Sequence, residues 1–151
     1  MHAGLKSKKI ALFGLGEAGS LVAIDMQKAG LNIMAYDPKP VATPAGVDRV
    51  QTPSEAVTDA DVVIALTAGD DALDALEQAI TNIPRTALYA DFSTNSATAK
   101  LAMADRAASF GFDFVDSGSW ERLAHSSNRC RHWCIALRRN FYFSRNAGSS
   151  P

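Results

Sequence analysis

The stretch KIALFGLGEAG, residues 9–19, decides the fold of this chain. Its apolar first half, residues 10–13, predicts a buried strand. Its second half is a turn with G-x-G-x-x-G spacing, formed by Gly14, Gly16 and Gly19. The pattern after the turn predicts a helix over residues 17–29. A glycine turn between a strand and a helix is the context in which this spacing binds a dinucleotide.

Each glycine of the turn has a separate physical role. Gly14 allows the sharp exit from the strand, Gly16 lets a diphosphate approach the backbone, and Gly19 lets helix and strand pack closely. The helix N-terminus offers unpaired N–H groups and the positive end of its dipole to the phosphates. The predicted cofactor contacts are therefore Gly14, Leu15, Gly16, Glu17, Ala18 and Gly19. The alternative is a flexible glycine turn that binds nothing.

The second predicted strand, residues 31–36, ends at Asp37, which lies 23 positions after Gly14. A carboxylate at this place accepts hydrogen bonds from the adenosine ribose and repels a 2′-phosphate. Asp37 therefore favours NAD over NADP. Lys39 lies nearby and weakens that preference, so NADP stays a second candidate. The alternative role for Asp37 is to form a turn before Pro38.

The rest of the chain up to residue 116 alternates strands with helices. Strands are predicted at 47–51, 61–66, 86–91 and 112–116, and helices at 53–59, 73–80 and 97–110. Thr52 and Ser96 are predicted N-caps, as is one of Asp70 and Asp71. This alternation predicts an α/β fold, a Rossmann-type doubly wound parallel sheet.

In a doubly wound sheet the ligand lies off the carboxyl ends of the strands. The loops expected there include residues 66–69 and 92–95. Their polar residues, which we expect to line a cofactor crevice, are Thr67, Ser93, Thr94 and Asn95. Each has an alternative role as a helix cap or as part of a solvated turn.

The composition is that of a globular chain, with 47% apolar and 21% charged residues among 151. No apolar run approaches the roughly 20 residues of a membrane span, and no secretory signal is evident. With a net charge of −1 and two cysteines, we expect a cytoplasmic protein with reduced thiols. We expect it to bind neither nucleic acid nor a membrane.

The charge divides the chain into two parts. Residues 1–116 hold nine Lys or Arg against fifteen Asp or Glu, whereas residues 117–151 hold six Arg against one Glu. We therefore interpret residues 1–116 as a dinucleotide-binding domain and residues 117–151 as an irregular basic tail. Our hypothesis is that the reading frame shifts near Asp116. The alternatives are a metal site using Cys130, His132 and Cys134, and a basic aromatic tail that binds nucleic acid or a membrane surface.

Five motifs in order resemble the β-hydroxyacid dehydrogenases, which include 3-hydroxyisobutyrate and 6-phosphogluconate dehydrogenases. They are GLGEAG at 14–19, AGL at 29–31, DADVVI at 59–64, DFST at 91–94 and FVD at 114–116. The first motif is shared by many Rossmann proteins. The ordered set, above all the Asp-x-Ser-Thr strand exit, is more specific, and the resemblance covers about residues 8–116.

The resemblance implies NAD(P) bound at the glycine turn, with further contacts from Leu66, Thr67 and Thr94. Thr67 stands where the family usually has proline. Family members oxidise an alcohol β to a carboxylate by hydride transfer to nicotinamide. Their fold continues into an all-helical domain that supplies the general-base lysine and the dimer contacts.

The resemblance stops after Asp116. Where the family has Ala-Pro-Val-Ser-Gly-Gly, this chain has SGSWER at 117–122, and its last lysine is Lys100. We therefore predict no catalytic residue and no metal site in this chain. A small 3-hydroxy acid would be a substrate only if a second domain were supplied. The alternative is a non-catalytic fragment that binds the nucleotide or self-associates as a homo-oligomer through uncovered surface.

Overall fold

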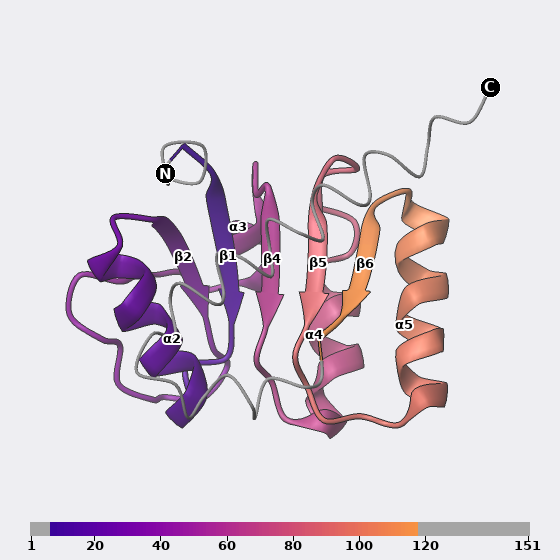
Figure 1. Cartoon of the computed structure of the whole chain (residues 1–151), viewed down its shortest axis with the longest axis horizontal. Coiled ribbons are helices and arrows are strands. Elements are labelled where there is room, and N and C mark those ends of the chain that lie inside the picture. The colour runs from indigo at the N-terminus through magenta and orange to yellow at the C-terminus, as the bar shows by residue number, and fades with distance from the viewer. Residues whose placement is uncertain (1–6, 118–151) are drawn as a thin grey trace.

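A parallel sheet forms the centre of the computed structural model, which describes residues 7–117 (Figure 1). Its strands are β1 (Lys9–Phe13), β2 (Asn32–Tyr36), β3 (Asp48–Arg49), β4 (Val62–Ala65), β5 (Leu88–Asp91) and β6 (Asp113–Asp116). The order across the sheet is β3-β2-β1-β4-β5-β6, and every neighbouring pair is parallel. This is the doubly wound order of dinucleotide-binding sheets, so the predicted fold class is confirmed.

The helices begin and end close to the predicted residues. They are α2 (Glu17–Lys28), α3 (Pro53–Val57), α4 (Ala72–Ala79) and α5 (Ala97–Phe110), with a short 3-10 helix, η1 (Gly69–Asp71), before α4. Two predicted N-caps are confirmed, because Thr52 Oγ1 accepts from the Glu55 N–H and Ser96 Oγ from the Ala99 N–H, both at 3.2 Å. After α5 the chain turns at Gly111, whose φ of 84° suits glycine.

The predicted acidic cap of α4 is confirmed in position but not in bonding, because Asp71 occupies the N-cap and its side chain makes no cap hydrogen bond. Neither Asp70 nor Asp71 caps the helix with its side chain, because η1 already places both residues in helical turns. Asp71 takes φ −90° and ψ −8°, whereas a side chain that caps a helix needs an extended backbone. The Asp71 carboxylate is therefore not used to cap the helix.

Two apolar clusters pack on the two faces of the sheet. On one face, α2 contributes Val22, Ala23 and Met26 against β1, β2 and β4. On the other face, α3, α4 and α5 pack around Phe13 and Tyr89. Figure 1 shows α2 in front of the sheet and α3 and α4 behind it. Strands β1 and β4 are buried on both faces, as central parallel strands are, and this explains their continuous apolar sequence.

The fold creates one topological switch point, where neighbouring strands β1 and β4 lead to helices on opposite faces. At such a point the carboxyl ends of the strands diverge and leave a crevice for a ligand. The glycine turn follows β1 and the Leu66–Thr67 segment follows β4, so the fold brings two predicted contact segments to this place.

Most of the predicted tail lies outside the described residues. Of residues 117–151, the structure describes only Ser117. The alternative metal site at Cys130, His132 and Cys134 and the alternative basic aromatic surface therefore lie outside the described residues. Within residues 7–117, no helix is both long enough and apolar enough to cross a membrane.

Candidate dinucleotide-binding site

The glycine turn has the shape that its spacing predicts. Gly14 has a φ of 95°, and a Cβ at Gly14 would collide with the carbonyl oxygen of Leu66. A Cβ at Gly19 would collide with the carbonyl oxygen of Gly14, because α2 packs directly on the turn. A Cβ at Gly16, in contrast, would meet no atom within 4 Å. The protein itself therefore needs glycine at positions 14 and 19, whereas position 16 borders open space.

The N-terminus of α2 is left without a side-chain cap. Gly16 occupies the N-cap position and has no side chain that could bond to the first-turn N–H groups. The Ser20 hydroxyl instead donates to the carbonyl oxygen of Leu15 at 2.8 Å. An uncapped helix N-terminus presents backbone N–H groups and a positive partial charge, which is how proteins bind phosphate.

Asp37 ties the glycine turn to the end of β2. Its Oδ2 accepts from the Leu15 N–H at 2.7 Å and its Oδ1 from the Lys39 N–H at 2.8 Å, while the Gly14 N–H donates to the Tyr36 carbonyl at 2.9 Å. Each carboxylate oxygen has a second acceptor position, so these bonds leave room for ribose hydroxyls. The second strand and the turn are therefore adjacent, as dinucleotide binding requires.

Arg49 holds the loop that follows Asp37. Its guanidinium donates to the carbonyl oxygens of Asp37, Lys39 and Val41 at 2.8, 2.6 and 2.6 Å. A planar guanidinium can serve several carbonyls because its donors are fixed in a fork. Arg49 therefore shapes this loop through its main chain. No local pattern in the sequence predicts this role, because Arg49 lies on a two-residue strand.

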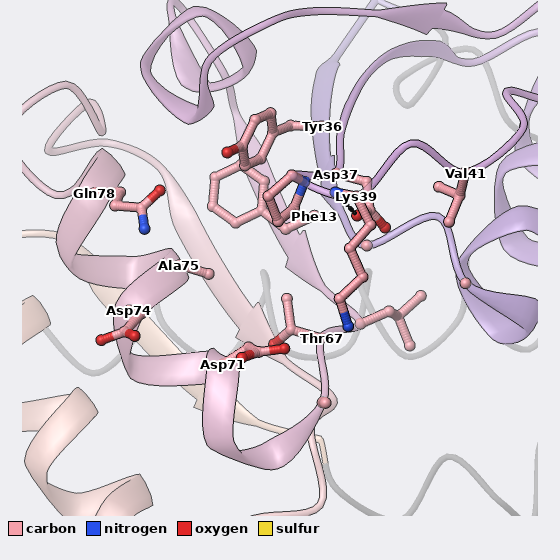
Figure 2. A pocket seen from close by; sticks show the side chains of 15 residues that line it. Phe13, Tyr36, Asp37, Lys39, Val41, Thr67, Asp71, Asp74, Ala75 and Gln78 are labelled. Carbon is pink, nitrogen blue, oxygen red and sulfur yellow. Dashed lines mark hydrogen bonds between the residues drawn. The ribbon is translucent and has the colours of Figure 1, made fainter.

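A pocket of about 360 Å³ lies at the switch point (Figure 2). Five of the predicted contact residues line it: Gly14, Gly16, Asp37, Leu66 and Thr67. The predicted contacts Leu15, Glu17, Ala18 and Gly19 lie in the same turn but do not line the pocket. The structure thus brings together residues from the turn, from the end of β2 and from the end of β4.

A further wall of the pocket, on α4 and the turn before it, was not predicted. Asp71, Asp74, Ala75 and Gln78 line the pocket at helical spacing i, i+3, i+4 and i+7, and Figure 2 shows them opposite Tyr36 and Asp37. The signal was present in the sequence as a polar stripe, since residues at this spacing share one helix face. It was missed because the helix was interpreted only through its apolar positions.

The predicted crevice residues after β5 lie outside this pocket. Asn95 Nδ2 donates to the Gly69 carbonyl at 2.7 Å, and a Cβ at Gly69 would lie 2.5 Å from the Thr94 carbonyl oxygen. The loop containing Ser93, Thr94 and Asn95 therefore packs against the turn that precedes α4. Ser93 itself is buried. Its main-chain and side-chain donors both bond to Asp91.

Lys100 is buried at the carboxyl ends of β5 and β6. Its Nζ lies 2.6 Å from Asp91 Oδ2, 2.8 Å from the Ser93 carbonyl and 3.0 Å from Asp116 Oδ1. An ammonium has three donors, and all three have acceptors here. Asp91 is fully buried, so the ion pair fixes α5 to the strand exit. The sequence did not predict this cluster of contacts around Lys100.

The comparisons with known proteins agree with this geometry. Residues 9–119 match the family model of the NAD binding domain of 6-phosphogluconate dehydrogenase. Among solved structures, 3-hydroxyisobutyrate dehydrogenase of Mycobacterium tuberculosis, with L-serine, is similar with a TM-score of 0.67 and 30% identity. The similarity covers 72% of this chain and 39% of that one. None of the curated proteins matches this chain significantly.

Two further solved structures show the fold at lower identity. An imine reductase variant from Myxococcus stipitatus in complex with NAD+ has a TM-score of 0.64 and 19% identity, over 73% of this chain and 40% of that one. A reductive aminase from Aspergillus terreus in complex with NADPH and ethyl levulinate has a TM-score of 0.60 and 18% identity, over 72% and 40%. This chain therefore spans about two-fifths of the length of each of these three proteins.

Proposed function

This chain belongs to the family of the NAD-binding domain of 6-phosphogluconate dehydrogenase, and from that premise we propose that its folded domain binds NAD with the diphosphate on the glycine turn. The observation that supports this most strongly is the open space at Gly16, beside an uncapped helix N-terminus. A side chain there would not disturb the protein, whereas it would occupy the place of a ligand. The residues present therefore fit the cofactor.

In this proposal each segment of the pocket has one role. The turn at Gly14, Leu15, Gly16, Glu17, Ala18 and Gly19 binds the diphosphate through main-chain N–H groups. Asp37 accepts hydrogen bonds from the adenosine ribose, and Leu66 and Thr67 contact the cofactor from the end of β4. Thr94 stays a predicted contact outside this pocket. When bound, NAD supplies the hydride acceptor, and the protein holds it in place.

We further propose that the chain forms the cofactor half of an oxidoreductase acting on a small 3-hydroxy acid, and does not turn over substrate by itself. Lys100 cannot act as a general base while its three donors are bound to Asp91, Ser93 and Asp116. A positioned base or acid contributes roughly 10²–10⁴-fold to such reactions. The second candidate function is a non-catalytic nucleotide-binding module. The same observation favours it, because the three donors of Lys100 are all bound within the protein.

A titration with NADH tests the nucleotide binding that both candidates require. We expect saturable binding, followed as a rise in nicotinamide fluorescence and in the thermal midpoint of unfolding. We expect no oxidation of small 3-hydroxy acids above the rate without protein, as measured by NADH formation. Absence of both fluorescence change and thermal shift would remove the proposed function, and measurable turnover would remove the proposal that the chain is inactive alone.

The charge of the pocket favours NAD over NADP. Three carboxylates line it, those of Asp37, Asp71 and Asp74, against the single ammonium of Lys39. In the part of the chain that the structure describes, the Lys39 amine has no ion-pair partner. A 2′-phosphate would add negative charge to a pocket that already has an excess of it, and such repulsion acts over several ångströms.

We therefore expect NADH to bind more tightly than NADPH, and the Asp71→Asn variant to bind NADPH about three- to tenfold more tightly than the unmodified chain, with little change for NADH. Competition titrations in low salt measure both affinities. Asp70→Asn is the matched control, because Asp70 is the exposed neighbour that does not line the pocket. Equal gains in the two variants would contradict a local role for Asp71.

A further inference from the structure

The loop after β2, residues 37–41, borders the pocket but has few main-chain donors of its own. Asp37, Lys39 and Val41 line the pocket, whereas positions 38 and 40 are prolines, which carry no N–H. Within the loop, the Lys39 N–H bonds to the Asp37 carboxylate and the Val41 N–H to the Lys39 carbonyl, both at 2.8 Å. The shape of this loop therefore depends on donors from outside it.

Arg49 supplies these donors from β3. Its Nη2 donates to the carbonyls of Asp37 and Lys39, and its Nη1 donates to the carbonyl of Val41. Nη1 also lies 3.5 Å from Thr43 Oγ1. Each terminal nitrogen of the guanidinium carries two N–H groups, and each has two acceptors in the protein. Arg49 borders an adjoining hollow of about 460 Å³, but these donors are already bound and cannot clamp a phosphate there.

The main chain of Arg49 is fixed to the strand that leads to Asp37. Arg49 pairs with Ala35 in the parallel register of β2 and β3, and the Val50 N–H donates to the Ala35 carbonyl at 2.9 Å. Ala35 is completely buried. The side chain of Arg49 therefore bridges from the sheet to the loop, and it fixes the loop relative to the carboxyl end of β2.

We propose that Arg49 is a positioning residue for the adenosine end of the dinucleotide, and that it acts through Asp37 without contacting the nucleotide. This inference rests on the proposed function, in which Asp37 accepts hydrogen bonds from the ribose. The Lys39 N–H, which orients Oδ1 of Asp37, belongs to the loop that Arg49 holds, whereas the Leu15 N–H orients Oδ2 from the glycine turn. Loss of the Arg49 bonds releases one of these two donors, so the carboxylate loses its fixed direction.

Arg49→Lys is the sharpest single test, because it keeps the positive charge but lacks the planar fork that serves three carbonyls. The affinity for NADH should fall about tenfold, because the ribose acceptor is no longer held in place. The affinity for NADPH should fall less than about threefold, because a released carboxylate can move away from the 2′-phosphate. Arg49→Met also removes the charge, and it should lower the affinity for NADH by a similar factor.

A double-mutant cycle with Asp37→Ala separates positioning from a general effect on the fold. In the Asp37→Ala background, Arg49→Lys should change the affinity for NADH less than about twofold, because the carboxylate that it positions is absent. Arg106→Lys is the matched control at an exposed guanidinium and should leave the affinity unchanged. Calorimetric titrations with NADH and NADPH measure the affinities, and thermal unfolding without nucleotide checks that each variant is folded.

The outcomes distinguish this inference from the proposed function. If the unmodified chain fails to bind NADH, the proposed function is wrong. If it binds, the positioning role is wrong when Arg49→Lys keeps the affinity for NADH, weakens both ligands equally, or has the same effect with and without the Asp37 carboxylate. A loss of NADPH binding in Arg49→Met but not in Arg49→Lys would show direct contact of the cation with the phosphate, and would also overturn it. In each of these cases the proposed function stands.

Discussion

Lys100→Met is expected to lower the free energy of unfolding by about 3–5 kcal/mol, the largest stability effect that the structure suggests. The substitution keeps the length of the side chain but leaves the Asp91 carboxylate, which is fully buried, without its cation. Asp91 would retain only its two bonds from Ser93. Urea unfolding followed by circular dichroism measures the change.

The control for this prediction is the exposed ion pair between Arg106 and Glu77. Two hydrogen bonds join the guanidinium to the carboxylate, but both side chains are exposed rather than buried. Arg106→Gln should therefore leave the urea midpoint almost unchanged. A loss below about 1 kcal/mol for Lys100→Met would show that the buried pair contributes no more than a surface pair does, and that the strand exit is held by packing alone.

Gly16→Val is expected to leave the fold intact and to weaken NADH binding at least about a hundredfold, about 2.7 kcal/mol. The backbone at Gly16, with φ −66° and ψ −163°, is extended and needs no positive φ, and a Cβ there would touch no protein atom. The new methyl groups would instead occupy the space proposed for the diphosphate. Thermal unfolding and NADH fluorescence, measured on the same samples, test both halves.

Gly19→Ala provides the contrast within the same motif. A single added carbon would collide with the Gly14 carbonyl, so α2 must move away from the turn. This variant should lose stability even without nucleotide, whereas Gly16→Val should not. If both variants unfolded at lower temperature than the unmodified chain, Gly16 would be a structural glycine and the evidence for a ligand at the turn would be lost.

The sequence was sufficient for the sheet because its periodic and turn signals are local. Strands such as residues 10–13 are buried on both faces and stay apolar throughout, and Thr52 and Ser96 cap helices through residues three positions away. The three glycines of the turn were predicted with their roles. Gly14 and Gly19 are confirmed as structural glycines by the atoms that a Cβ would meet.

The remaining features depend on contacts between distant segments, which no local pattern reveals. The bonds of Lys100 to Asp91 and Asp116 form only after α5 and β6 are in place, and Arg49 reaches back over eight positions or more to the loop after β2. Asp71 occupies the predicted N-cap position of α4, but its side chain makes no cap hydrogen bond and lines the pocket instead. The side chains of α4 and the turn before it could therefore be assigned to the pocket only once the fold was known.

If a diphosphate lies on the main-chain amides of the glycine turn, an amide chemical-shift titration of this 16.1 kDa chain with NAD will detect it there. We expect the largest shifts at the amides of residues 14–19, with further shifts at Asp37 and Thr67. Binding of the diphosphate at the turn would be contradicted if NAD moved none of these amides, or if the largest shifts lay on α5 and β6.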